Sequence, residues 1–167
     1  MNKVLLILLL TMVTLGANAQ VTTDTTLVDV EQMAKSETAK MPKYKSGMAS
    51  VVQYVMNNLK YPKEADENGV EGKVLMTFVV DKDGSLTQIT PLRTAVHFFD
   101  VKKLSEKTGI NEQELISHYG QLFQEEGIRI LAAMPKWKPG MLNGEPVRVK
   151  YTLPVTFAIP RFAKYHM

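Results

Sequence analysis

The side chains best suited to catalysis or metal binding lie far apart in this sequence. Its three histidines, His97, His118 and His166, form no ligand motif. The chain has no cysteine, which excludes thiolate catalysis, thiolate zinc sites and disulfides. It also lacks a nucleophile elbow, a phosphate loop, a dinucleotide fingerprint and an H-E-x-x-H motif. We therefore expect a protein that is not an enzyme and that needs neither a metal nor a cofactor.

Two acidic patterns deserve comparison with functional motifs. Asp81-x-Asp83-Gly84 resembles part of a calcium loop, but the third ligand position and the distal glutamate are missing. Lying between two apolar runs, this tetrapeptide is more typical of a hairpin turn. The carboxylates of the longest predicted helix are scattered as on a solvated face, so no acid–base pair stands out among Glu112, Glu114, Glu125 and Glu126.

The composition is that of one folded domain of ordinary size. The chain has 167 residues, of which 45% are hydrophobic and 22% charged. Its net charge of +3 is too small to indicate nucleic-acid binding by itself. Residues 104–115 have helix-turn-helix spacing, but Glu112 and Glu114 would face the DNA phosphates. We expect no nucleic-acid partner.

The first residues are typical of a secretory signal peptide. Lys3 precedes an apolar run, Val4–Leu15, and the small residues Ala17 and Ala19 provide a cleavage site. At about 1.5 Å per residue, this run is too short to cross a hydrocarbon core roughly 30 Å thick. We expect residues 1–19 to be removed, which predicts a periplasmic protein without a stable membrane anchor. The alternative is an uncleaved anchor.

Residues 20–41 predict a flexible polar segment. Threonines cluster at its start, and Pro42 is the first proline of the chain, so this is no stiff proline spacer. A brief alternation over 27–31 could also pair as an edge strand.

Apolar periodicity then predicts the secondary structure. A helix capped by Ser46 and ended by Pro62 has a stripe that should pack on a sheet, formed by Met48, Val51, Val52, Val55 and Leu59. A central strand over 73–80 and a returning strand over 85–92 flank the turn at 81–84. Pro91 places the end of the second strand at an edge or a bulge. A short helix at 100–108 ends at Gly109, and a long helix runs from Asn111 to Pro135.

The last strand offers the most plausible binding surface. Apolar and polar residues alternate from Val147 to Phe157, and Pro154 suits an edge position because it cannot donate a ladder hydrogen bond. Such an edge is either simply protected by its charges and proline or able to accept an extended peptide. The element order predicts an α+β fold, a two-layer sandwich with a small antiparallel sheet and helices on one face.

The ordered set of motifs resembles the C-terminal domain of the TonB energy-transducer family. The matching segments are Leu59-Lys60-Tyr61-Pro62 with Ala65, Gly72-Lys73-Val74, Phe78-Val79-Val80, Asp83-Gly84, Met134-Pro135-Lys136-Trp137-Lys138-Pro139-Gly140, Asn143-Gly144-x-Pro146-Val147 and Leu153-Pro154-Val155-x-Phe157. On this basis the domain spans 42–160, with an enlarged insertion at 93–113 and a tail at 161–167. Residues 1–20 lack the histidine of the anchoring helix that working transducers have, and the long proline-rich spacer is absent.

The resemblance implies a periplasmic module associated with TonB-dependent transport. Its partners would be N-terminal peptides of TonB-dependent outer-membrane receptors, added as a strand beside the last strand of the sheet. The partner-binding residues carried over are Tyr61, Pro62, Val147, Arg148, Val149, Lys150, Tyr151, Thr152 and Thr156. Two alternatives remain: an anchored energy transducer for outer-membrane transport, and a structural envelope protein that forms a homodimer through the same strand.

Overall fold

The computed structural model describes residues 27–28, 33 and 37–160. The predicted signal peptide at 1–19 and the tail at 161–167 lie outside the described residues. The elements, in chain order, are β1 (Leu27–Val28), α2 (Met48–Asn58), α3 (Lys63–Glu67), β2 (Val70–Val80), β3 (Leu86–Phe98), α4 (Val101–Thr108), α5 (Glu112–Ala132), β4 (Gly140–Leu142) and β5 (Glu145–Phe157).

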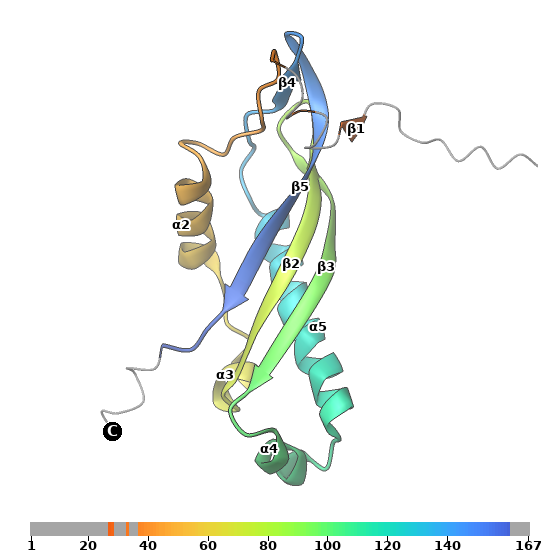
Figure 1. Ribbon diagram of the computed structural model, residues 1–167. Helices are drawn as coiled ribbons and strands as arrows, with labels where there is room; N and C mark the ends of the chain where they lie inside the picture. Colours follow the sequence, from red (N-terminus) through yellow and green to blue (C-terminus); the bar gives the residue numbers. More distant parts are fainter. Residues whose placement is uncertain (1–26, 29–32, 34–36, 161–167) are drawn as a thin grey trace, which may run out of the picture.

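The sheet and the helices form two layers (Figure 1). The strand order is β1-β5-β2-β3, and β2 pairs antiparallel with both β3 and β5. Helix α5 packs across β2 and β3 on one face of the sheet, and the other face is open. The predicted α+β fold with a small antiparallel sheet is confirmed.

The centre of the core lies between β2 and α5. Alternate residues of β2 point toward α5, and Val74, Met76 and Phe78 are buried there. At Gly72 the helix comes so close that an added Cβ would lie 2.5 Å from the Phe123 ring. A side chain at this position would force the helix off the sheet, because a packed core tolerates little added volume.

The two helices predicted between residues 100 and 135 are present. Asn111 caps α5 through its side chain, which accepts the Glu114 amide hydrogen. Gly109 ends α4 in the left-handed conformation, with φ of 71°. Asp100 also caps α4 by accepting the Lys103 amide hydrogen.

Strand β3 continues beyond the predicted end at residue 92. Pro91 lies inside the strand, opposite Met76, and the register shifts between Leu75 and Met76. The extra residue in this β-bulge is accommodated because β3 pairs on one side only, among the described strands. The edge-or-bulge interpretation of Pro91 is confirmed, whereas the strand end was wrong: residues 93–98 also belong to the sheet.

Helix α2 differs from the sequence prediction at its start and on its surface. The N-cap is Gly47 rather than Ser46, whose hydroxyl bonds to that of Ser50. Val51 is buried as expected, but Met48 and Val52 are 47% and 50% exposed. The predicted stripe therefore packs against the core along only one of its sides.

The described residues of the predicted flexible segment lie against the domain. Leu27–Val28 forms β1 and pairs in parallel with Arg148–Val149. Met33 is buried and close to Gly140, and Lys40 forms a bridge with Met141. At these positions backbone pairing and burial offset the loss of chain entropy.

Candidate functional site

Strand β5 has one occupied edge and one largely open edge. Its inner edge pairs with β2 from Val149 to Phe157 without a register shift. Its outer edge pairs with β1 at Arg148–Val149, and β4 forms a hairpin with the residues just before them. Within the described ranges, no strand covers the outer edge over 150–157. We call this stretch the open edge.

The peptide groups of the open edge alternate in direction. Pro154, which has no N–H, is accommodated where its nitrogen faces away from β2. The Tyr151 carbonyl, by contrast, faces β2 and accepts a hydrogen bond from the Thr77 hydroxyl at 3.3 Å. Because strand residues alternate in direction, we infer that Thr152 and Thr156 present their N–H groups outward together with position 154.

The side chains of the open edge divide cleanly between two faces. Leu153, Val155 and Phe157 are buried on the helix side. Lys150, Thr152 and Thr156 are exposed on the open face. A strand added here would be held mainly by backbone bonds, and its side chains would meet two chemically different surfaces.

Three of the predicted partner-binding residues are engaged by the chain itself. Val147 pairs with Gly140 in the β4–β5 hairpin, and Val149 pairs with Val28. The Arg148 Nε donates to Asp81 Oδ1 at 2.7 Å, and both side chains are mostly buried. These contacts fix the beginning of β5, so the part accessible to another chain starts at Lys150.

The predicted Tyr61–Pro62 corner lies at the far end of β5. The Tyr61 ring makes an edge contact with Phe157 at a centroid distance of 5.9 Å. Its hydroxyl donates to the Val70 carbonyl at 2.8 Å. Burial, together with the negative charges of Glu71 and Asp66, raises the pKa of Tyr61 to about 12. Tyr61 is therefore a neutral packing residue that brings the corner next to the open edge.

A buried carboxylate holds the chain just before this corner. Glu126 of α5 accepts the Lys60 amide hydrogen at 2.6 Å and bonds from Arg129 to both of its oxygens. Arg129 also donates to the Asn58 carbonyl. Burial opposes ionisation of Glu126, but the hydrogen bonds from Arg129 and Lys60 outweigh it and lower the pKa of this carboxyl.

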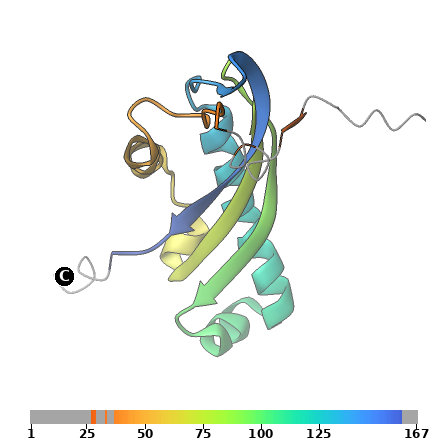
Figure 2. The same cartoon turned by 45° about the horizontal axis from the view of Figure 1, so that its top comes forward.

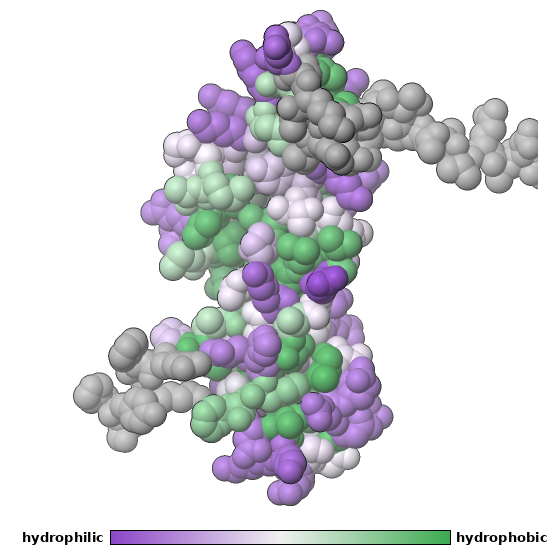
Figure 3. Space-filling view, in the orientation of Figure 1, coloured by the Kyte–Doolittle hydropathy of each residue, from purple (hydrophilic) through white to green (hydrophobic). Residues whose placement is uncertain are grey.

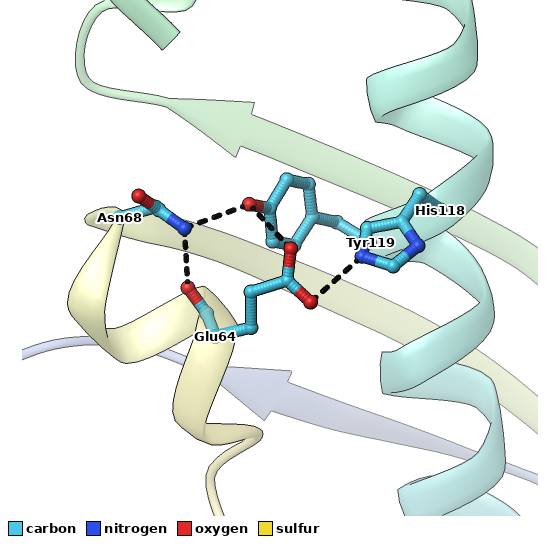
Figure 4. A network of polar contacts seen from close by, with 4 residues as sticks. All are labelled: Glu64, Asn68, His118 and Tyr119. Atoms are coloured by element: carbon cyan, nitrogen blue, oxygen red, sulfur yellow. Dashed lines mark hydrogen bonds and ion pairs between the residues drawn. The ribbon is translucent and has the colours of Figure 1, made fainter. Parts of the chain in front are cut away.

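A second polar network joins α3 to α5 (Figure 4). Glu64 lies 2.9 Å from His118 Nε2 and accepts the Tyr119 hydroxyl at 3.4 Å. Asn68 donates to the same hydroxyl, and Lys107 of α4 donates to Asn68. Burial and the charge of Glu64 raise the pKa of Tyr119, so this phenol stays protonated at neutral pH. No local sequence pattern predicts these contacts, because their partners are far apart along the chain.

The Glu64–His118 pair is better suited to joining helices than to catalysis. Both side chains are about half exposed, with 51% and 44% of their surfaces accessible to solvent. A separate hollow of about 410 Å³ lies between β3 and α5, and its lining includes neither residue of the pair. Across residues 27–28, 33 and 37–160, no group of three His, Asp or Glu side chains could hold a metal ion.

Comparison with known protein families relates one part of the chain to a described domain. Residues 57–97, from the end of α2 almost to the end of β3, match the family described as Gram-negative bacterial TonB protein C-terminal. This part of the chain is similar to the C-terminal domain of TonB. TonB C-terminal domains are interaction modules of the cell envelope associated with TonB-dependent transport.

Solved structures of similar proteins include two solution structures of the C-terminal domain of Helicobacter pylori TonB. The longer shares 16% sequence identity, with 67% of this chain and 79% of that chain covered and a TM-score of 0.42. The shorter shares 20% identity, with 66% and 90% covered and a TM-score of 0.38. No curated protein matches this chain in sequence. None of the described helices is long and apolar enough to cross a membrane.

Proposed function

We propose that this TonB C-terminal domain binds extended N-terminal peptides of outer-membrane receptors by strand addition to the open edge of β5. The observation that carries the proposal is the regular edge from Lys150 to Phe157, on which no described strand pairs and Pro154 faces outward. In strand addition the backbone bonds supply affinity, and alternate side chains supply selectivity. The domain acts in this proposal as a protein-binding module rather than as an enzyme.

The Tyr61–Pro62 corner supports the proposal by its position. It is attached to the end of β5 through the contact with Phe157 and to α5 through the Lys60–Glu126 bond. A peptide running along the open edge toward Phe157 would meet this corner next. Such a strand pair loads several backbone bonds at once when it is pulled along its length, so a modest affinity can still transmit force.

The proposed location is the periplasm, after removal of residues 1–19. N-terminal sequencing of the protein purified from cells tests this directly. A chain that starts at Gln20 supports export as a module without an anchor. A chain that retains Lys3 and the apolar run after it favours the alternative of an anchored energy transducer.

The decisive experiment compares two substitutions at one position of β5. Thr152→Pro removes the outward N–H and places a ring in the path of the added strand, whereas Thr152→Ala removes only the side chain. Binding of a fluorescent receptor N-terminal peptide to the purified protein should weaken about a hundredfold with Thr152→Pro and less than about threefold with Thr152→Ala.

Equal affinities for the two variants, both folded by circular dichroism, would contradict strand addition at this edge. Sedimentation of the unliganded protein provides the check on the homodimer alternative. A concentration-dependent dimer that Thr152→Pro dissociates would assign the edge to a second copy of the chain instead.

A further inference from the structure

Helix α2 exposes a group of apolar side chains on its surface. Met48, Val52 and Met56 follow one another at four-residue spacing, so they lie on one side of the helix. They are 47%, 50% and 74% exposed, respectively. We call these three residues the α2 stripe. Exposed apolar side chains that gather on one surface often mark an interaction site.

The position of α2 explains why the stripe is uncovered. Helix α5 lies over β2 and β3, whereas α2 lies beside the outer edge of β5 in both views (Figures 1 and 2). The Tyr54 hydroxyl holds α2 to the end of α5 by donating to the Ala133 carbonyl. In a two-layer sandwich a helix covers strands. The strand position that α2 would cover is the one beyond the open edge.

The surface view shows the same relation from outside. Apolar surface lies over the side of α2 that is turned to the viewer (Figure 3). A strand added to β5 would direct every second side chain toward the helix layer, on the side where α2 lies. Methionines suit such a contact because their flexible side chains adapt to different partners.

The opposite face of an added strand would meet positive charge. Lys150 of β5, Lys73 of β2 and Arg93 of β3 lie on the open face of the sheet, as their cross-strand pairings show. Glu71 is the acidic residue of β2 on this face, and it is engaged by the Ile159 amide. The charge of the open face therefore favours acidic side chains in the partner.

The chain's own N-terminal segment provides an internal example. Leu27–Val28 already pairs with the beginning of the same outer edge. In sequence, the residues from Val28 onward alternate apolar and acidic types: Val28, Asp29, Val30 and Glu31. Leu27 and Val28, the residues described at this edge, are apolar, and the acidic residues follow them in sequence.

We propose that the α2 stripe and the open edge together form one binding surface, which selects extended segments with apolar residues toward α2 and acidic residues toward the basic face. The inference rests on the proposed function, because the segment is held by strand addition. It adds the partner's chemistry: at least two apolar side chains at alternate positions, separated by acidic ones.

The test uses synthetic peptides and the full-length protein. One fluorescent peptide alternates valine and glutamate; a second replaces each valine with serine and keeps every glutamate. The double variant Val52→Gln/Met56→Gln should bind the first peptide about tenfold more weakly than wild type does. It should bind the second as weakly as wild type does. Leu92→Gln is the matched control, because Leu92 is 62% exposed on β3 and should leave binding unchanged.

Three results distinguish the role of the α2 stripe from strand addition to β5, the proposed function on which it rests. If Thr152→Pro abolishes binding and the α2 double variant does not weaken it, strand addition stands and the role of α2 is wrong. If the serine peptide binds as tightly as the valine peptide, the selectivity is also wrong. If neither Thr152→Pro nor the double variant affects binding, both proposals fail. A peptide of alternating valine and lysine should bind at least about tenfold more weakly than the glutamate peptide.

Discussion

The two long edges of the sheet differ in regularity. Along β5 the ladder to β2 runs from Val149 to Phe157 without a shift, which leaves the outer peptide groups evenly arranged. Along β3 the ladder shifts twice, at Leu75/Met76 and at Thr77/Val79. Gln88 has a positive φ of 50°, and Pro91 interrupts the donors. Bulges and prolines of this kind are how proteins protect an edge strand from pairing.

The surroundings of the two edges differ as well. The hollow beside β3 is lined mainly by uncharged polar side chains, three of them glutamines: Gln113, Gln121 and Gln124. The β5 edge lies beside helix α2 and the Tyr61–Pro62 corner. The comparison indicates that the β3 edge is irregular, whereas the β5 edge has the evenly arranged backbone groups that the proposed strand addition requires.

The largest expected effect on the fold concerns Glu126, whose carboxylate holds the chain just before the Tyr61–Pro62 corner. Glu126→Gln removes the charge that holds Lys60 N–H and Arg129, and should lower the free energy of unfolding by about 2 kcal/mol. Gln124→Ala is the control on the same helix, since Gln124 bonds only to Thr94 of β3. It should cost less than about 1 kcal/mol in urea denaturation. Equal losses of unfolding free energy in the two variants would mean that the Glu126 contacts stabilise the fold no more than the bond between Gln124 and Thr94 does.

The same carboxyl predicts a pH dependence. Its pKa is lower in the folded than in the unfolded state, so its stabilisation is complete above the unfolded value of about 4.3 and is lost as pH falls through the folded value. Wild type should therefore lose more unfolding free energy than Glu126→Gln between pH 5 and pH 3. Parallel stability curves for the two proteins in this range would show that Glu126 does not contribute.

A smaller effect on peptide binding is expected when the prolines of the two edge strands, Pro154 of β5 and Pro91 of β3, are replaced. Pro154→Val adds an outward N–H to the open edge and should tighten binding of a receptor N-terminal peptide about fivefold, the value of one net hydrogen bond. Pro91→Val adds a donor to the irregular β3 edge and should leave binding unchanged. Tighter binding by Pro91→Val, measured by isothermal titration, would show that β3 also accepts the peptide.

The smallest effect concerns β1. Val28→Pro removes a donor from the short parallel pair with Arg148–Val149 and should release the beginning of the outer edge. Peptide affinity should rise about twofold to threefold, because only two residue positions become available. Weaker binding by this variant would mean that β1 supports the site instead of competing for it.

Strong local patterns predicted most of the fold. The period-two alternation of β5 and the caps at Asn111 and Gly109 each act within a few residues, and all three are present. The missed features depend on distant partners. The alternation over 27–31 allowed an edge strand but did not indicate β5 as its partner, and the bond from Lys60 to Glu126 has no signature in either local segment.

The candidate site shows the same division. The alternation and Pro154 predicted an edge position for the last strand. That β1 pairs with the beginning of this strand is known only from the tertiary structure. Met48 and Val52 have the helical spacing of core residues, which is why they were predicted to pack on the sheet. Their exposure follows from α2 lying beyond β5, a position that periodicity alone does not specify.

The most direct test of the account is the mapping of backbone amide chemical shifts while a receptor N-terminal peptide is titrated onto the isotope-labelled protein. The account predicts the largest shifts at Lys150, Thr152 and Thr156, smaller ones along α2, and none along β3. Shifts concentrated between Leu86 and Phe98, with β5 unchanged, would contradict it.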